Sequence, residues 1–226
     1  MHDQKSIRLS SDGSHTLFSD TFGVTYHSFH GAITESTVVF IDAGLHYFAH
    51  RAKKNISVFE MGFGTGLNAL LAAIWADKEN IEVAYHTVES NPISTELAEK
   101  LNYPQHLGHH ELFKSLHSAH WDLEIELSPK FTFKKYHCRL EDLPFAQKYD
   151  VIFYDAFSPG EQPSLWETEI LKTMFDILLP GGILVTYCAK GQFKRTLRGL
   201  GFEVQSLAGP PGKREITRAI KVNEHF

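Results

Sequence analysis

The segment 60–68 combines an acidic residue with three alternating glycines, and it stands between an apolar segment and an Ala/Leu-rich one. Glycine lets the backbone approach a ligand closely, and the N-terminus of a following helix offers unpaired N–H groups. The pattern therefore predicts a loop that binds a nucleotide cofactor. Its candidate cofactor-binding residues are Glu60, Gly62, Phe63, Gly64, Thr65, Gly66 and Asn68.

The spacing of the glycines separates two classes of cofactor. A dinucleotide fingerprint has the form G-x-G-x-x-G, whereas Leu67 stands at the position of its third glycine in this chain. NAD is therefore disfavoured. The acidic-x-Gly-x-Gly-x-Gly form resembles motif I of class I S-adenosylmethionine (AdoMet) methyltransferases, and this resemblance implies AdoMet as the cofactor.

Two further positions are candidates for the nucleoside part of such a cofactor. Glu89 ends the next apolar segment, where its carboxylate is expected to accept hydrogen bonds from both ribose hydroxyls. The alternative is a solvated charge at a strand end. Asp142, with Leu143, follows the third expected strand, where this fold commonly recognises adenine. Asp142 could instead cap a short helix that begins at Leu143.

A second stretch with chemical potential, 149–159, is an apolar strand that ends at Asp155. Open α/β sheets bind ligands at the carboxyl ends of their strands. In amine-methylating enzymes a carboxylate there can accept N–H bonds from the nucleophile and stabilise the positive charge on nitrogen. Asp155 is therefore the candidate catalytic residue and, with Phe157, a candidate cofactor contact. The alternative for Asp155 is a structural cap on the next turn.

Strand and helix patterns alternate along most of the chain, which predicts an α/β fold with a parallel sheet. The expected strands are 56–60, 82–89, 131–138, 150–155 and 182–188, and the expected helices are 66–77, 92–101, 140–147, 164–178 and 190–199. Two last strands, 202–207 and 215–221, have only a short Gly/Pro loop between them, so they are expected to pair antiparallel. By resemblance to class I methyltransferases, the sheet is expected to be Rossmann-like and seven-stranded, with this hairpin at one edge.

The N-terminal region, 1–54, is expected to form a small extension that packs on a main domain, 55–226. Within the extension we expect a hairpin over 16–31 and a helix over 35–53. The segment 103–129 is longer than a standard crossover, so it is expected to be an insertion near the mouth of the site.

Composition is that of an ordinary soluble domain: 226 residues, 42% hydrophobic and 22% charged, with a net charge of −5. The sequence has neither a long apolar run nor an apolar signal core near its start, so it indicates no membrane span and no export. Two cysteines, Cys138 and Cys188, lack metal-ligand spacing and fit a reducing compartment. A cytoplasmic location is expected.

Basic residues are concentrated in 190–221, which predicts a local basic face. They are Lys190, Lys194, Arg195, Arg198, Lys213, Arg214, Arg218 and Lys221. The alternative is an ordinary solvated helix face plus a loop.

Two other parts of the sequence resemble metal or phosphate sites: the histidines of the insertion and the loop 209–213. Five of the 14 histidines lie in the insertion: His106, His109, His110, His117 and His120. Without an HExxH or Cys/His module, they favour an exposed histidine-rich segment over a metal site, and no metal is expected. The loop 209–213 lacks the outer glycine and the hydroxyl residue of a Walker A loop, so a P-loop is rejected.

Several motifs together resemble the MnmC-like methyltransferases, which complete the 5-methylaminomethyl group on the wobble uridine of certain tRNAs. They are Asp12-Gly13-Ser14, Tyr26-His27-Ser28, Gly31-Ala32, Glu35-Ser36, Val39-Phe40-Ile41, Gly44-Leu45, the loop 60–68, the run 155–159, Leu165-Trp166 and the segment 209–215. The resemblance covers about 12–220.

The resemblance implies conversion of 5-aminomethyl-(2-thio)uridine in the tRNA anticodon to its 5-methylaminomethyl form, with Asp155 orienting the amine. Candidate substrate contacts are Tyr26, His27, Ser28, Pro159, Trp166, Lys213 and Arg214. For Tyr26, His27 and Ser28, the alternative is plain hairpin packing. Since no second glycine fingerprint follows, we expect a methyltransferase without the flavin oxidoreductase half, supplied with its aminomethyl precursor by another enzyme.

Two other functions stay open from sequence. The cofactor motifs do not report the size of the acceptor, so a small-molecule or protein amine is one alternative. A non-catalytic RNA-binding protein that keeps the fold is the other.

Overall fold

The computed structural model describes residues 4–50 and 55–222. A run of parallel strands forms the centre of its large sheet: β4 (Asn55–Met61), β5 (Glu82–Val88), β7 (Phe131–Tyr136), β8 (Tyr149–Tyr154) and β9 (Leu178–Thr186). Every residue of β8 is buried, as expected for a strand with helices on both faces. The predicted parallel α/β core is confirmed.

Antiparallel strands close both edges of this sheet. On one side β11 (Glu215–Lys221) lies between β9 and β10 (Phe202–Ala208), so the predicted hairpin is confirmed. On the other side β6 (Ile125–Ser128) pairs with β7, which makes the sheet eight-stranded, in the order β10-β11-β9-β8-β4-β5-β7-β6. The sequence analysis expected seven strands because β6 is short and lies within the insertion.

Helices cover the two faces of the sheet with separate apolar clusters. Helix α3 (Leu67–Glu79), the π-helix η1 (Thr37–His46) and α6 (His110–Ser118) supply one cluster, and α7 (Thr168–Ile177) and α8 (Gly191–Gly199) supply the other. Gly44 lets η1 lie close to the sheet, because a Cβ there would come within 3.2 Å of Phe153 and Val185 side chains. The sheet is therefore buried on both sides.

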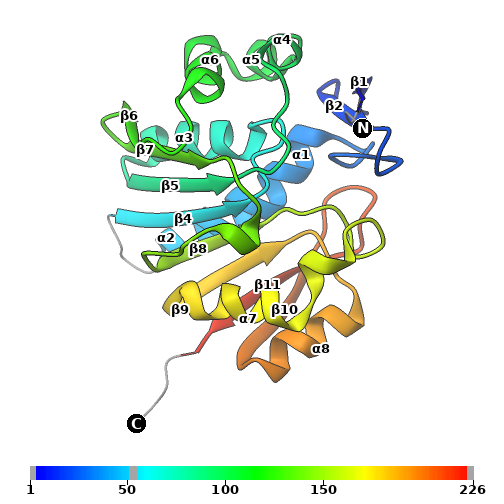
Figure 1. Cartoon of the computed structure of the whole chain (residues 1–226), viewed down its shortest axis with the longest axis vertical. Coiled ribbons are helices and arrows are strands. Elements are labelled where there is room, and N and C mark those ends of the chain that lie inside the picture. The colour runs from blue at the N-terminus through cyan, green and yellow to red at the C-terminus, as the bar shows by residue number, and fades with distance from the viewer. Residues whose placement is uncertain (1–3, 51–54, 223–226) are drawn as a thin grey trace.

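The N-terminal extension forms a separate three-stranded sheet, seen beside α1 (Ala32–Ser36) in Figure 1. Its strands are β1 (Lys5–Leu9), β2 (His15–Ser19) and β3 (Val24–Thr25), so the hairpin expected over 16–31 has a third strand before it. The helix expected over 35–53 is found as α1, η1 and α2 (Tyr47–Ala49), and its expected last residues, 51–53, lie outside the described residues. The expected domain boundary at 54/55 also falls there and stays a prediction.

The insertion carries α5 (Tyr103–Leu107), α6 and β6, and Figure 1 shows α5 and α6 grouped with α4 (Thr95–Ala98) at one end of the molecule. The helix expected over 140–147 is only a 3₁₀ turn, η2 (Leu140–Asp142). Pro144 comes two residues after it, and proline both lacks the N–H that would continue a helix and restricts the residue before it, Leu143. The helix expected over 164–178 is divided at Glu167 into η3 (Pro163–Trp166) and α7.

None of the helices within 4–50 and 55–222 has the length and apolar character that crossing a bilayer requires. Within the same residues, no three or more His, Cys, Asp or Glu side chains are grouped so that they could hold a metal ion. Cys138 and Cys188 are both free thiols.

Candidate functional site

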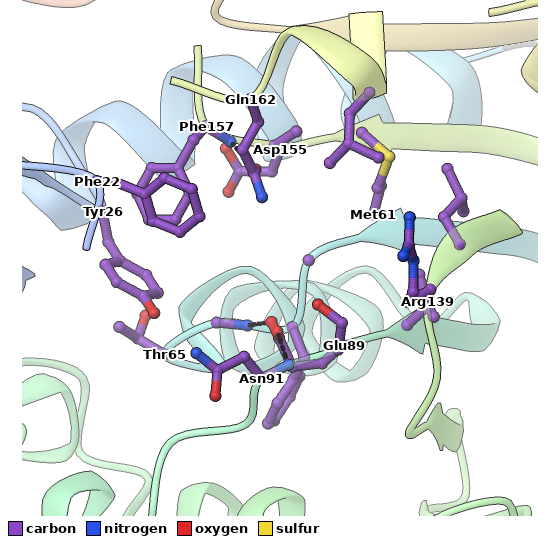
Figure 2. A pocket seen from close by; sticks show the side chains of 18 of the residues that line it. Phe22, Tyr26, Met61, Thr65, Glu89, Asn91, Arg139, Asp155, Phe157 and Gln162 are labelled. Carbon is purple, nitrogen blue, oxygen red and sulfur yellow. Dashed lines mark hydrogen bonds between the residues drawn. The ribbon is translucent and has the colours of Figure 1, made fainter. Parts of the chain in front are cut away.

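A cavity of about 500 Å³ opens at the carboxyl ends of β4, β5 and β8. Its volume lies in the usual range for small-molecule sites. Many predicted site residues line it: Tyr26, His27, Gly62, Phe63, Gly64, Thr65, Asn68, Glu89, Asp155 and Phe157. In Figure 2 the cavity lies between two groups of side chains: Phe22, Tyr26 and Phe157 on one side, and Glu89 and Asn91 along the lower edge of the view.

The glycine loop between β4 and α3 needs glycine at all three positions, because Gly62, Gly64 and Gly66 have φ values of 92°, 52° and 74°. Side chains would also collide there: a Cβ on Gly62 would lie 3.2 Å from the Asp155 carbonyl oxygen, and one on Gly66 would lie 2.9 Å from His117 Nε2. The loop is thus a close-approach backbone cradle, which fits the predicted cofactor-binding segment.

His117, from the insertion, supports this loop from below. Its Nε2 lies 3.1 Å from the Thr65 carbonyl oxygen and donates to it, since a carbonyl only accepts. Burial lowers the pKa of His117 to about 4, so the ring is neutral near pH 7. The contact was not predicted, because nothing in the sequence distinguishes His117 from the other four histidines of the insertion.

Glu89 holds the loop from the other side. Its two carboxylate oxygens accept from the backbone N–H groups of Gly64, at 3.0 Å, and Asn91, at 2.8 Å. The side chain lines the cavity. Glu89 therefore shapes the loop as well as facing the space predicted for the ribose, and it is not a free surface charge.

At the far end of the cavity, the residues that line it after β7 are Cys138, Arg139, Leu140 and Glu141. Asp142 and Leu143, predicted to recognise adenine, do not line it: Asp142 is exposed and Leu143 is buried in the apolar core. The 3₁₀ turn η2 changes side-chain direction at each residue, and strand-end counting could not anticipate which one faces inward. Glu141 is the carboxylate at this end.

Glu60 lies beneath the loop and outside the cavity lining. It is fully buried, with the polar side chains of Asn68, Tyr85 and Thr87 around its carboxyl group. Burial, followed by the nearby Asp155, raises the pKa of Glu60 well above its ordinary value. Glu60, a candidate cofactor-binding residue in the sequence, therefore lies behind the loop rather than in the cavity lining.

Asp155 follows the carboxyl end of β8 and faces the cavity. Its Oδ2 accepts a hydrogen bond from Asn68 Nδ2 at 2.8 Å, and this bond fixes the carboxylate. Burial raises the pKa of Asp155 to about 7, against the opposing effect of the Asn68 hydrogen bond. Asp155 is thus a positioned carboxylate that can exchange a proton near neutral pH.

An aromatic wall stands beside Asp155. The ring of Phe157 packs against Phe22, with centroids 4.5 Å apart, and edge-on against Tyr26 at 4.9 Å. Trp166 does not line the cavity; its Nε1 donates to the Phe157 carbonyl oxygen at 2.7 Å. Pro159 and Ser28 are also outside the lining. The wall therefore uses Phe22, which the sequence analysis did not select, and needs Trp166 as its support.

His27 extends this wall with a neutral imidazole. Its Nδ1 shares a hydrogen bond with Thr16 Oγ1 at 3.1 Å, and burial lowers its pKa to about 4. Ser28 plays another part, because its N–H donates to Glu35 Oε2 at 2.6 Å. The segment 26–28 is thus anchored to buried groups and presents only its first two residues to the cavity.

Lys213 does not reach the cavity either. Its Nζ forms an ion pair with the buried Glu35 and lies 4.0 Å from the ring centroid of Tyr187. Tyr187 in turn donates to the Ala156 carbonyl oxygen at 2.8 Å. The loop between β10 and β11 is therefore tied to Glu35 of the N-terminal extension and, through Tyr187, to the loop that follows β8.

The predicted basic face is smaller than the sequence suggests. Lys194 is buried and pairs with Glu215, Arg218 stacks on Tyr47, and Lys221 donates to the carbonyl oxygens of Phe175 and Leu178. These cations, like Lys213, hold the fold together. Those that are exposed are Lys190, Arg195, Arg198 and Arg214.

A glycine cradle at the carboxyl edge of a sheet in this strand order, with a fixed carboxylate on the next strand, defines a class I AdoMet-dependent methyltransferase. Residues 98–222 match the family described as S-adenosyl-L-methionine-dependent methyltransferase, and the chain belongs to that family. AdoMet is the cofactor of that family, and the cradle fits it because Gly62 and Gly64 leave bare backbone along the cavity.

Curated relatives are longer than this chain. A protein of Ralstonia nicotianae, named tRNA 5-methylaminomethyl-2-thiouridine biosynthesis bifunctional protein MnmC, is 29% identical over 224 residues, which are 94% of this chain and 34% of the relative. One of the same name from Idiomarina loihiensis is 28% identical, over 96% of this chain and 38% of the relative. The chain thus spans about a third of the length of these relatives.

Among solved structures, MNMC2 from Aquifex aeolicus superposes with a TM-score of 0.78 at 27% identity, covering 96% of this chain and 70% of that one. A Listeria monocytogenes protein described as a putative class I S-adenosylmethionine-dependent methyltransferase gives a TM-score of 0.51 at 15% identity, covering 86% of this chain and 62% of that one, which supports the fold alone. The resemblance to the MnmC family that the sequence indicated is confirmed.

Proposed function

We propose that this chain transfers a methyl group from AdoMet to the 5-aminomethyl group of the wobble uridine in tRNA, giving 5-methylaminomethyl-(2-thio)uridine. The observation that carries the proposal is Asp155, a carboxylate fixed by Asn68 in the cavity, with its pKa raised to about 7. The names of the relatives in Ralstonia nicotianae and Idiomarina loihiensis support tRNA as the acceptor.

The chemistry required of the protein is modest. Bound AdoMet supplies an electrophilic methyl group on its sulfonium sulfur. The aminomethyl group arrives mainly as an ammonium, which has no lone pair, so a nearby base must take a proton first. Asp155 accepts that proton and orients the free amine, and the aromatic wall of Phe22, Tyr26 and Phe157 keeps water from it.

The same proposal assigns the other cavity residues to the cofactor or to the acceptor, with some residues replaced relative to the expectation from the sequence. Gly62, Gly64, Gly66 and Glu89 form the cofactor side, with Glu141 in place of Asp142 at its far end. Tyr26 and His27 line the acceptor side, and Arg214 is an exposed cation for RNA. A cytoplasmic location, and a separate enzyme that supplies the aminomethyl precursor, are part of the proposal.

The test is methyl transfer from radiolabelled AdoMet to bulk tRNA from cells that lack their own final methylation step, followed by nucleoside chromatography. Label in 5-methylaminomethyl-type uridine is the expected result. No label in RNA, with AdoMet binding intact by calorimetry, would overturn the proposal. Free amines and protein lysates assayed in parallel would then report a small-molecule or protein acceptor.

A further inference from the structure

Gln162 lies on the loop between β8 and η3 and lines the cavity next to Asp155. Its Oε1 accepts a hydrogen bond from the Phe157 N–H at 3.2 Å. That bond fixes the orientation of the amide, because the reverse orientation would bring two donors together. The NH₂ group of Gln162 is therefore turned away from the Phe157 backbone.

This NH₂ group is available to a ligand. Figure 2 shows the Gln162 side chain beside Asp155 and pointing into the cavity. Within 4–50 and 55–222 its nitrogen has no hydrogen-bond partner, and Gln162 is only partly buried. The cavity thus presents a fixed donor, from Gln162, next to a fixed acceptor, from Asp155.

The same part of the cavity carries the aromatic wall. Phe22 and Phe157 present rings whose centroids are 4.5 Å apart, and Phe157 is only two residues after Asp155. Aromatic side chains can stack a nucleobase that has left its helix. The acceptor base of the proposal below is placed against this wall, with its edge toward Asp155 and Gln162.

The neighbouring donor and acceptor match two neighbouring positions on one kind of base. In a 5-aminomethyluracil, C5 carries the amine and the adjacent C4 carries a carbonyl oxygen. In the matching cytosine, C4 carries an amino group, which would face the NH₂ of Gln162 as donor against donor. We propose that Gln162 donates to the C4 carbonyl of the acceptor base, and that this contact selects uracil over cytosine.

This inference rests on the proposed function and can be tested separately from it. Two synthetic anticodon stem-loops, identical except for 5-aminomethyluridine or 5-aminomethylcytidine at the acceptor position, are methylated by the full chain. The measured quantity is the ratio of kcat/KM for the two RNAs. Wild-type protein is expected to prefer the uridine RNA by about tenfold or more, the effect of one mismatched buried hydrogen bond.

Gln162→Glu is the informative variant, because one carboxylate oxygen can still accept the Phe157 N–H while the other presents an acceptor in place of the donor. The added charge near Asp155 affects both RNAs alike and cancels in the ratio. The uridine preference is expected to fall by about tenfold or more, or to reverse. Gln162→Met, which has no polar group, should bring the ratio close to one without reversing it.

Each outcome bears on the proposal. An unchanged ratio in both variants, with AdoMet binding retained, would overturn the role of Gln162 but leave the methyltransferase function standing. Equal use of both RNAs by wild-type protein would overturn it as well. Failure of the wild-type protein to methylate either RNA would instead reject the proposed function and, with it, this inference.

Discussion

Glu35 and Lys213 are 178 positions apart in the chain and form an ion pair outside the cavity lining. Glu35 anchors the Ser28 N–H, and Lys213 lies against Tyr187, which holds the Ala156 carbonyl oxygen. The pair thus connects the N-terminal extension, the last hairpin and the loop that carries Asp155. Its two charges act on that carboxyl in opposite directions.

The first prediction uses this opposition. Glu35 raises the pKa of Asp155 and Lys213 lowers it. Because a base is active only when deprotonated, Lys213→Met should move the acid limb of kcat/KM to higher pH, and Glu35→Gln should move it to lower pH. Each shift is expected to be roughly 0.5–1 pH unit. The measurement is the pH profile of methyl transfer at low acceptor concentration.

Other groups near Asp155 must stay unchanged in that comparison. They are Asn68, Glu60, Tyr85 and Tyr187. A loss of packing alone would lower activity in both variants and leave the limb in place, or move it the same way in both. Shifts in one shared direction would therefore contradict the electrostatic account.

A second prediction concerns Asp155 itself. Asp155→Asn keeps an oxygen that can accept from Asn68 Nδ2 but removes the proton acceptor. The expected result is a fall in kcat of about 100-fold or more and loss of the acid limb near pH 7. AdoMet affinity, measured by calorimetry, should change little. Full activity with an unaltered pH profile would remove Asp155 from the mechanism.

The glycine loop allows a matched pair of variants. Gly66 and Gly108 have φ values of 74° and 77°, yet a Cβ on Gly66 would lie 2.9 Å from His117 Nε2 and one on Gly108 would meet no atom within 4 Å. Both alanine variants should lose about 1 kcal/mol or more of unfolding free energy from backbone strain. Only Gly66→Ala should also weaken AdoMet binding, by about tenfold or more, because His117 and the Thr65 carbonyl must move.

Thermal unfolding and AdoMet titration of the two variants give the check. Equal AdoMet affinity in both would mean that the cradle tolerates a side chain and that the loop does not approach the cofactor closely.

The parts of this molecule that were predictable are those encoded by local pattern. Alternating apolar segments predicted the parallel core, and the loop 60–68 was singled out by its glycines and supplies residues of the cavity lining. Asp155 was predictable because its strand is apolar throughout and ends there. Each of these features can be recognised from residues that are close together in the sequence.

What could not be predicted depends on contacts between distant segments. Glu141 lines the cavity and Asp142 does not, because the 3₁₀ turn η2 sets the direction of each side chain. His117 is the histidine of the insertion that contacts the glycine loop, because of where α6 packs. Lys194 and Lys213 looked like RNA-binding cations until their partners, Glu215 and Glu35, were brought to them by the fold. Charge in the sequence does not say which charges are already paired.

The last prediction follows from that distinction. Arg195 and Arg214 are exposed, whereas Lys194, the residue before Arg195, is buried and paired with Glu215, the residue after Arg214. If tRNA docks near the last hairpin, Arg195→Glu and Arg214→Glu should each weaken RNA binding and reduce the slope of log K against log salt by about one. Lys194→Met should instead lower the unfolding temperature and leave the salt slope unchanged.

Lys78→Glu, an exposed change in the last turn of α3, is the control for net charge. Equal slopes for Arg195→Glu, Arg214→Glu and Lys78→Glu would place the RNA on another surface.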